Sequence, residues 1–486
     1  MFAQPSFCAA RPIMNDLPPL WGPQTGLQQA RRDRTASVRP DAPRIKSAAA
    51  VALHMHQPLI PAGGEDLTSA RLISNLEYMA EHPGEPDSHN HSVYHRCYRR
   101  PGEFIASLIE EGKEPRLMLE YSGTLFEGLR RMGISDVFHE LDRITRPGPY
   151  RHAVEWLGAA WGHAVAPSTP VQDYRWHVRA WQQHFSELFG VEALARVRGF
   201  SPAEMALPNH PDVAYEFVRT LRDAGYDWVL VQEHTVEDPA TGRAPDRRHL
   251  PHRLVCQNSR GETASITAII KTQGSDTKLV GHMQPYYEAR GLDRVEFLGQ
   301  RVPQLVTQIA DGENGGVMMN EFPDKYFEVV RQSSGSDTPL VNVSEYLELL
   351  RDLGILAEHL PPLQPIHQKR IWDRLEAGAG PERLAAVLGE LAREGHGFHV
   401  EGGSWTSDIS WVRGYEGLLN EMQQTSAMFF ERAGSGADPS EERFQNALFH
   451  LLSSQTSCYR YWGQGKWTDY GRELCRRTRE ILLHDF

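Results

Sequence analysis

The sequence predicts an α/β fold built on parallel strands and followed by a mainly helical C-terminal third. Between residues 49 and 312, short apolar runs alternate with helical patterns, which is typical of βαβ units in a parallel sheet or barrel. After about residue 340, apolar residues recur at three-and-four spacing, which indicates helices. The chain has 486 residues, enough for one large domain with an accessory region.

The first strand is expected at SAAAVALHMHQP, where the apolar run 49–55 stops just before Pro58. Five later runs have the same character, and they occupy residues 116–123, 153–162, 227–234, 265–270 and 305–312. The clearest helix between strands is expected to begin at Pro211, which suits a first helical turn, and to stop at Gly225. Strand, helix and strand therefore follow one another there, as a βαβ unit requires.

The first 48 residues differ from the rest and predict a disordered tail. They contain seven prolines and show no apolar periodicity. Seven Lys and Arg against three Asp make this segment basic, so the remainder of the chain carries the acidic excess. The C-terminal helices are expected within 342–355, 380–395, 415–434 and 441–462, with a loop at 434–442.

Composition excludes several classes of function. A net charge of −12 and a pI near 6.0 argue against broad binding to nucleic acids or anionic membranes. No apolar run approaches the length of a transmembrane helix, and the N-terminus lacks the apolar core of a signal peptide. The five cysteines are widely spaced and form no CxxC motif, which disfavours a zinc finger or disulfide framework and fits a cytoplasmic protein.

The stretch GFSPAEMALP places one carboxylate, Glu204, among small and apolar residues. Pro202 and Pro208 disfavour a helix through it, so Glu204 is expected on irregular backbone after a short strand. In barrel enzymes the loops after strands carry the chemistry, which makes Glu204 a candidate nucleophile. The alternative interpretation is a solvated loop glutamate.

Two histidines end the first predicted strand. His54 and His56 alternate with Met55, so both side chains fall on one face of that strand. They could bind a metal, hydrogen-bond sugar hydroxyls, or be satisfied within the core. Residue types and spacing leave the three interpretations open.

A second candidate acid, Asp311, ends an apolar run and precedes a glycine-rich turn in ADGENGG. Asp, Asn and Gly are turn formers, so an ordinary turn is one interpretation. The other is a carboxylate held over a cavity at the end of a barrel strand. Two acids at different strand ends are what a glycosidase needs, one to attack carbon and one to protonate the leaving oxygen.

Other polar residues are ambiguous from the residue pattern alone. Glu120, Glu155 and Glu313 could contact substrate or face solvent. The segment 87–98 is rich in histidine but does not match the HExxH zinc motif, and it is interpreted as loop and helix surface.

Five stretches in order resemble glycoside hydrolase family 57, over roughly residues 49 to 470. They are HMHQP, VEWLGAAWGHAVAP, GFSPAEMALP, ADGENGG and SQTSCYRYWGQGKW. The family acts on α-glucans and some α-galactosides. The resemblance implies an incomplete (β/α)7 barrel over 49–345 that carries the catalytic site, and a helical region over 346–486 that packs on the barrel.

By this resemblance, Glu204 matches the catalytic nucleophile and Asp311 the general acid/base. His54 and His56 match paired histidines that line a sugar subsite without a metal. Further substrate-binding positions implied by the motifs are Glu155, Glu313, Trp405 and Trp462. The sequence departs from the family pattern at Ser201, where a Trp is common, and in its last motif, which lacks the usual acid.

The leading hypothesis is a cofactor-independent retaining glycosidase or α-glucanotransferase acting on an α-linked oligo- or polysaccharide such as glycogen. One alternative is a metal-dependent hydrolase of the polysaccharide deacetylase kind, with His54 and His56 as ligands. Another is a barrel that binds carbohydrate with little catalysis. The sequence does not separate hydrolysis from transfer, because both use the same two carboxylates.

Overall fold

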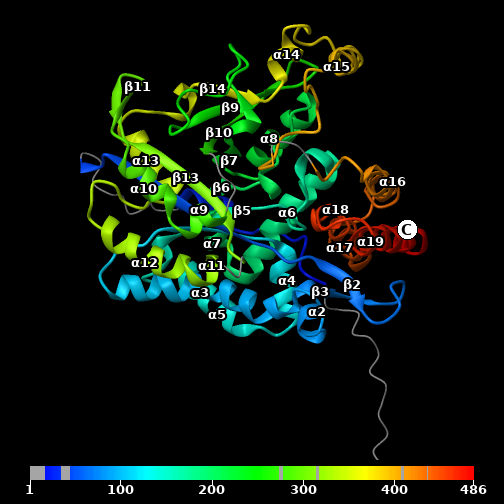
Figure 1. Cartoon of the computed structure of the whole chain (residues 1–486). Coiled ribbons are helices and arrows are strands. Elements are labelled where there is room, and N and C mark those ends of the chain that lie inside the picture. Colours follow the sequence, from blue (N-terminus) through cyan, green and yellow to red (C-terminus); the bar gives the residue numbers. More distant parts are fainter. Residues whose placement is uncertain (1–16, 34–43, 273–276, 314–316, 407–409, 435) are drawn as a thin grey trace, which may run out of the picture.

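The computed structural model describes residues 17–33, 44–272, 277–313, 317–406, 410–434 and 436–486. Its centre is a barrel of seven parallel strands (Figure 1). In order around the barrel they are β1 (Ser47–Met55), β4 (Leu117–Tyr121), β5 (Val154–Gly158), β6 (Gly199–Phe200), β7 (Trp228–Gln232), β10 (Thr263–Lys271) and β13 (Gln304–Asp311). β13 pairs with β1 over eight positions, whereas β10 meets β13 only at Lys271 and Thr307. The predicted seven-stranded α/β barrel is confirmed.

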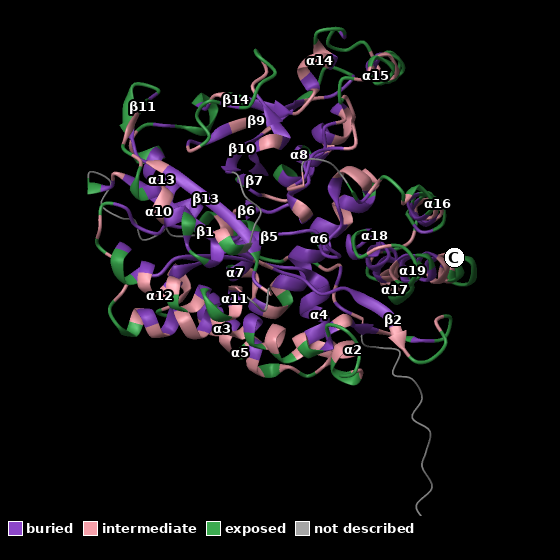
Figure 2. Cartoon of the chain, viewed as in Figure 1, coloured by how far each residue is buried: buried purple, intermediate pink, exposed green. Residues whose placement is uncertain are grey.

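Side chains alternate between the inside of the barrel and the surrounding helices. On β1, Ala50 and Ala52 belong to the inner apolar cluster, while Val51 and Leu53 pack in the outer one. Because the strand period is two, the next inward position after Ala52 is His54. The strands are buried along nearly their whole length (Figure 2), as expected for a parallel sheet covered by helices.

Helices between the strands cover the outside of the barrel. The longer ones are α3 (His91–Glu110), α5 (Ser135–Thr145), α6 (Val171–Phe189), α8 (Pro211–Asp223) and α12 (Phe322–Ser333). α8 begins at Pro211 as predicted, and Gly225, at φ 83°, stands just beyond its last turn. Shorter helices are α2 (Asn75–Glu81), α4 (Gly123–Arg131), α7 (Val191–Ala195), α9 (Thr277–Gly281), α10 (Gln284–Arg290) and α11 (Val317–Asn320).

Additional strands extend the sheet beside β10. β9 (His252–Gln257) pairs antiparallel with β10, and β14 (Pro362–Pro365) links β9 to β8 (Val236–Glu237). β11 (Val295–Phe297) and β12 (Gln300–Val302) form a separate hairpin. The N-terminal end of the barrel is closed by α13 (Val343–Asp352), whose Tyr346, Leu349 and Leu350 join the inner apolar cluster.

Part of the predicted tail is folded. Residues 27–33 form α1 (Leu27–Asp33), and Leu20 and Leu27 are buried in the main core. The Arg31 guanidinium donates a 2.7 Å hydrogen bond to the Ala224 carbonyl after α8. The prediction of disorder for 17–33 is therefore wrong, because a few apolar residues can dock onto an existing core without a periodic pattern of their own. Residues 1–16 and 34–43 lie outside the described part.

The C-terminal third is helical, as predicted. It contains α14 (Gln368–Trp372), α15 (Pro381–Glu394), α16 (Glu416–Arg432), α17 (Glu442–Ser453), α18 (Cys458–Tyr461) and α19 (Lys466–Asp485). α16 to α19 lie together at one side of the barrel (Figure 1). Since α13 spans the predicted boundary at 345 and plugs the barrel, the division into 49–345 and 346–486 stays a prediction.

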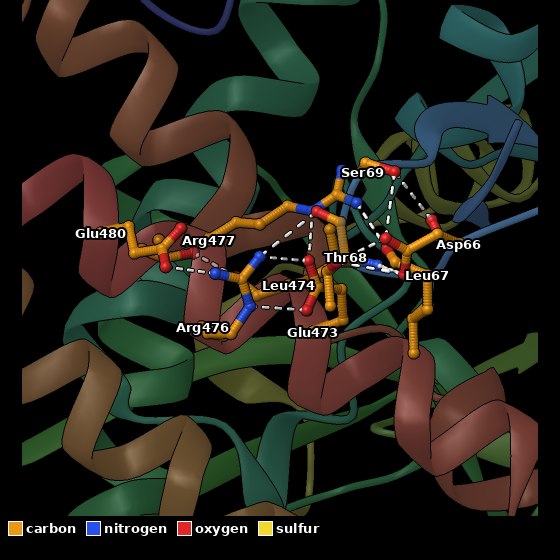
Figure 3. A network of polar contacts seen from close by, with 10 residues as sticks. Asp66, Leu67, Thr68, Ser69, Glu473, Leu474, Arg476, Arg477 and Glu480 are labelled. Atoms are coloured by element: carbon orange, nitrogen blue, oxygen red, sulfur yellow. Dashed lines mark hydrogen bonds and ion pairs between the residues drawn. The ribbon is translucent and has the colours of Figure 1, made fainter. Parts of the chain in front are cut away.

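The last helix is tied to a hairpin that follows the first barrel strand. β2 (Leu59–Gly63) and β3 (Arg71–Ser74) form this hairpin directly after the HQP sequence. In Figure 3, Arg476 of α19 lies between Glu473 and Glu480, and Arg477 reaches from Glu473 to the hairpin loop, where it donates to the Leu67 carbonyl at 2.9 Å. The C-terminal helices thereby fix the chain that leaves the end of β1. Among the described residues, no helix is long and apolar enough to span a membrane.

Candidate active site

Polar side chains gather at the C-terminal end of the barrel. His54 is in register with Glu120 on one neighbouring strand and with Asp311 on the other. All three follow inward-facing apolar positions, so they form the last inner layer of this part of the barrel. The sequence predicted His54 and Asp311 here, and the register of β4 adds Glu120.

His54 and Glu120 form a buried ion pair. The Nδ1 atom of His54 hydrogen-bonds a Glu120 carboxylate oxygen, and both side chains are largely shielded from solvent. Burial alone would lower the pKa of His54, but Glu120, assisted by Asp311 and Glu313, raises that pKa to about 10. His54 is therefore an imidazolium at neutral pH.

Three imidazole rings stack at this end of the barrel. His163 lies between His54 and His56, with ring centroids 4.6 Å and 4.2 Å away. Burial lowers the pKa of both His56 and His163, and the charge on His54 lowers both further. One cation is thus held beside two neutral rings. Sequence reasoning missed His163, although the residue lies inside the quoted stretch VEWLGAAWGHAVAP.

His56 is held from several sides. Its Nδ1 atom hydrogen-bonds the Ser122 hydroxyl at 2.8 Å, and its Nε2 lies 3.3 Å from the Thr456 hydroxyl. Its backbone N–H donates to Glu313 Oε1 at 2.8 Å. Because both ring nitrogens of His56 already lie near protein groups, the ring is held in place. It has little hydrogen-bonding capacity left for a ligand.

Glu204 lies in a tight turn with a left-handed backbone. Its φ and ψ are 58° and 21°, and Met205 after it also has positive φ, at 50°. Such conformations cost about 1–3 kcal/mol each for residues other than glycine, and they cluster at functional sites. Pro202 precedes the turn, as the sequence suggested. The turn is not a solvated loop, because the Glu204 side chain is only 15% exposed.

The Glu204 carboxylate has defined partners. The Trp405 indole donates to Oε2 at 2.8 Å, and His163 Nδ1 lies 3.8 Å from Oε1. His163 Nδ1 also shares a 2.8 Å hydrogen bond with the Ser457 hydroxyl. Burial raises the pKa of Glu204, the Trp405 indole opposes that shift, and the negative charge of Asp311 adds to it. The two predicted catalytic acids are thus close enough to interact electrostatically.

The segment that carries Trp405 pairs with the Glu204 turn. Leu207 and Gly403 exchange backbone hydrogen bonds of 2.8 Å and 3.1 Å, and the Trp405 N–H reaches the Glu204 carbonyl at 3.3 Å. Gly402, at φ 91°, allows this approach, since a Cβ there would meet the Leu207 carbonyl at 2.8 Å. The EGGSW sequence therefore places an indole directly on the carboxylate.

Asp311 and Glu313 differ in accessibility. Asp311 is exposed at the end of β13, whereas Glu313 accepts from the His56 backbone. Burial raises the pKa of Glu313 to about 8, with Tyr98 and His54 opposing the shift. Glu313 is therefore tied to the protein, and Asp311 is the acid free to meet a ligand. Residues 314–316 of the ADGENGG stretch lie outside the described part.

An aromatic cluster borders the acids. Tyr461, which is 45% exposed, packs against Trp411 at 5.6 Å and Trp405 at 6.4 Å between ring centroids. Burial raises the pKa of Tyr461, and Glu204 and Asp311 raise it further. The predicted Trp462 is 57% exposed and faces Trp467 at 5.8 Å. Tyr461, not singled out from the sequence, is the aromatic residue of this motif nearest the acids.

Glu155 lies at the other end of the barrel, away from Glu204 and Asp311, and its contact with substrate stays a prediction. It is the second residue of β5, near the N-terminal end of the barrel, and it is buried. Both of its oxygens accept from Ser344 of α13, one from the hydroxyl and one from the backbone N–H at 3.0 Å. The sequence could not show this, because Ser344 lies 189 positions away. Glu155 caps a structural helix.

The histidines of segment 87–98 lie on the outside of the barrel, as predicted from their spacing. His91 and His95 are on α3, and His95 contacts Asp136 at 3.0 Å on the outside of the barrel. Across the described ranges, no group of three or more His, Cys, Asp or Glu side chains is arranged to hold a metal ion. His54 and His56 are engaged instead by Glu120 and Ser122.

Comparison with known proteins identifies the barrel. The family model for glycosyl hydrolase family 57 matches residues 50–269, which include His54 on β1, Glu120 on β4 and the turn with Glu204 after β6. This part of the chain, from β1 into β10, is similar to that family. The comparison with curated protein sequences finds no matching relative.

Two solved structures of proteins with known activities share the fold of this chain. A branching enzyme of the family from Pyrococcus horikoshii superposes with a TM-score of 0.55 and 12% identity, over 89% of this chain and 88% of that one. A 4-α-glucanotransferase from Thermococcus litoralis gives a TM-score of 0.53 and 16% identity, over 89% of this chain. The chain spans 57% of the length of that glucanotransferase. At these identities the likeness concerns the fold.

Proposed function

We propose that this protein is a retaining glycoside hydrolase or transglycosidase that acts on α-glucans. The observation that carries the proposal is the arrangement of Glu204 and Asp311. Glu204 is fixed in a strained turn by the Trp405 indole, and Asp311 is an exposed acid on a strand three places away in the barrel order. The negative charge of Asp311 raises the pKa of Glu204, and this effect supports a shared site.

In the proposed first step, the Glu204 carboxylate attacks the anomeric carbon while the glycosidic bond breaks. Asp311 gives its proton to the departing oxygen. In the second step, Asp311 takes a proton from water or from an acceptor hydroxyl, whose oxygen attacks the same carbon and releases Glu204. Each displacement inverts the anomeric centre, so the product retains the configuration of the substrate.

The His54 cation supports the role of Glu204 as nucleophile. Burial favours the protonated carboxyl, which cannot attack carbon, and the nearby imidazolium favours the ionised form. Tyr461 and Trp405 provide flat faces beside the acids, and such faces suit the apolar sides of sugar rings; the buried Trp411 supports Tyr461 from behind. The α-glucan substrate is proposed from the family and from the named activities of the two structural neighbours.

The test is product analysis with maltoheptaose and glycogen, with and without EDTA. We expect the first-formed product to keep the α configuration in proton NMR, and EDTA to leave the rate unchanged. Products longer than maltoheptaose would identify transfer, and glucose or short maltooligosaccharides alone would identify hydrolysis. A first-formed β-anomer would contradict the retaining mechanism, and loss of turnover only with EDTA would favour the deacetylase-like alternative.

A further inference from the structure

A cavity lies at the opposite end of the barrel from Glu204 and Asp311. Its volume is about 270 Å³, and it opens between the loop before β5, the segment between α7 and β6, and α13. Polar groups on its wall include Thr145, Arg151, His152, Arg196, Asn342 and Glu345. A space of this size accepts a small organic molecule rather than a few waters, since each water occupies about 30 Å³.

Two of the three carboxylates on the wall of this cavity are paired with arginines. Both Glu345 oxygens accept from Arg116 Nε at 2.9 Å, and Glu348 accepts from Arg198 at 2.5 Å. Glu155 is held by Ser344. All three acids therefore have protein donors on their oxygens, and none of them forms an ion pair with Arg151 or Arg196 among the described residues.

Two arginines are left without such a partner. Within the described ranges, neither Arg151 nor Arg196 forms an ion pair, and Arg151 donates no side-chain hydrogen bond. Arg196 donates only to the Arg151 carbonyl, at 2.9 Å, which brings the two residues together. Burial lowers the pKa of Arg196, and the charge of Arg151 lowers it further, while Glu155 and Glu345 oppose the shift without cancelling it. Two adjacent cations facing one cavity call for an anion.

We infer that this cavity binds a phosphate monoester of about monosaccharide size, with its phosphate held by Arg151 and Arg196. A guanidinium presents paired N–H donors that match phosphate oxygens, and a dianion balances two such groups. The imidazole of His152 and the amide of Asn342 line the wall around the rest of the ligand, whereas the Thr145 hydroxyl is already engaged by Leu141 and Trp156. The inference stands independently of the chemistry proposed for Glu204.

The test is calorimetric titration of the full chain with glucose 6-phosphate, and separately with inorganic phosphate. We expect one saturable site per chain, with glucose 6-phosphate binding more tightly because the cavity exceeds a single phosphate. Arg151→Gln should weaken binding by about tenfold or more, the effect of losing a hydrogen bond between charged groups. Arg393→Gln, which removes an exposed arginine of α15, is the matched control and should bind like the wild type.

Arg151→Gln is the decisive variant, because Arg151 makes no side-chain contact whose loss would unfold the described structure. A melting curve checks that it folds, and Arg196→Gln provides a second measurement. Absence of saturable binding to either compound, or equal affinity in Arg151→Gln and wild type, would overturn the inference. Inorganic phosphate that binds as tightly as glucose 6-phosphate would overturn the assignment to a monoester.

Discussion

The two ends of the barrel hold their carboxylates in opposite ways. At the N-terminal end, Glu155 and Glu345 are buried and each accepts hydrogen bonds on both oxygens. At the C-terminal end, Asp311 is exposed, and Glu204 is held by one indole on a strained backbone. Burial of an acid alone therefore does not mark a site of chemistry. A carboxylate that is fixed in place and still has accessible oxygen lone pairs does mark such a site.

The cations differ in the same way. Arg116 and Arg198 at the N-terminal end are permanent charges that pair with Glu345 and Glu348. At the C-terminal end the cation is His54, whose charge depends on Glu120. At one end the cations are arginines, which stay protonated, and at the other the cation is a histidine that a single neighbour keeps protonated. The first arrangement favours stability, and the second can be adjusted around a reaction.

The largest expected effect comes from exchanging one buried glutamate at each end for glutamine. Glu204→Gln should reduce turnover on maltoheptaose by on the order of 10⁴-fold, because an amide cannot replace a nucleophile, while the melting temperature stays close to that of the wild type. Glu155→Gln should do the reverse. It should leave turnover close to wild type and lower the free energy of unfolding by about 1–3 kcal/mol, because one Ser344 donor loses its acceptor.

Steady-state rates and urea unfolding on the two proteins test this contrast. A Glu204→Gln protein that keeps turnover would remove Glu204 from the proposed mechanism. A Glu155→Gln protein that loses turnover without losing stability would return Glu155 to the active site.

The next effect concerns stability at the N-terminal end. Arg116→Met should lower the free energy of unfolding by about 3–5 kcal/mol, because it leaves Glu345 buried without its cation. The double variant Arg116→Met with Glu345→Leu should recover much of this loss, since no buried charge then remains. Urea unfolding of both variants measures the difference. A loss below about 1 kcal/mol for the single variant would mean that the pair behaves like a surface ion pair.

A smaller effect is expected from the indole on the nucleophile. Trp405→Phe should lower kcat/KM roughly 10- to 100-fold, the effect of removing a hydrogen bond to a charged group. Trp411→Phe is the control, because within the described residues the buried Trp411 indole N–H has no hydrogen-bond partner. Equal losses in the two variants would assign Trp405 to packing and not to the orientation of Glu204.

The smallest effect at neutral pH, and the sharpest in its pH dependence, should come from Glu120→Gln. In the wild type His54 stays charged up to a pKa of about 10, so its contribution to kcat/KM falls only in the alkaline range. Without Glu120, burial lowers the pKa of His54 and only Asp311 and Glu313 still oppose it, so that limb should move from the alkaline range toward neutral pH. A pH profile that matches the wild type would exclude His54 as the titrating group, and Glu155→Gln serves as the control.

The direction in which stability changes with pH follows from the same ion pair. Since the pKa of His54 is raised from 6.5 to about 10, the pair contributes fully below pH 6.5 and its contribution is lost as the pH rises through 10. The difference in unfolding free energy between wild type and Glu120→Gln should therefore shrink over that range. A difference that grows with pH would contradict the ion pair.

Local patterns were sufficient for much of the fold. The apolar runs that predicted strands correspond to β1, β4, β5, β7, β10 and β13, and Pro211 marked the start of α8. The two-residue strand β6 was too short for a periodicity, and only the flanking prolines pointed to the turn at Glu204. The helix α1 was missed, because its burial depends on the core formed by distant residues and not on its own pattern.

The same distinction between local patterns and contacts of distant residues applies to the candidate site. Sequence alone singled out Glu204, Asp311, His54 and His56, since each stands at a strand end beside a proline or a glycine-rich turn. It did not separate Glu155 from them, because the partner that makes Glu155 structural, Ser344, is distant in the chain.

By itself the sequence determined the alternation of strands and helices and the residue types at the strand ends, because these depend on neighbours a few positions apart. Only the tertiary structure decided which carboxylate meets an indole and which meets a serine. It also placed His163 between His54 and His56 and left Arg151 and Arg196 facing one cavity. Charge, pKa and accessibility are properties of the environment, and that environment is supplied by residues far apart along the chain.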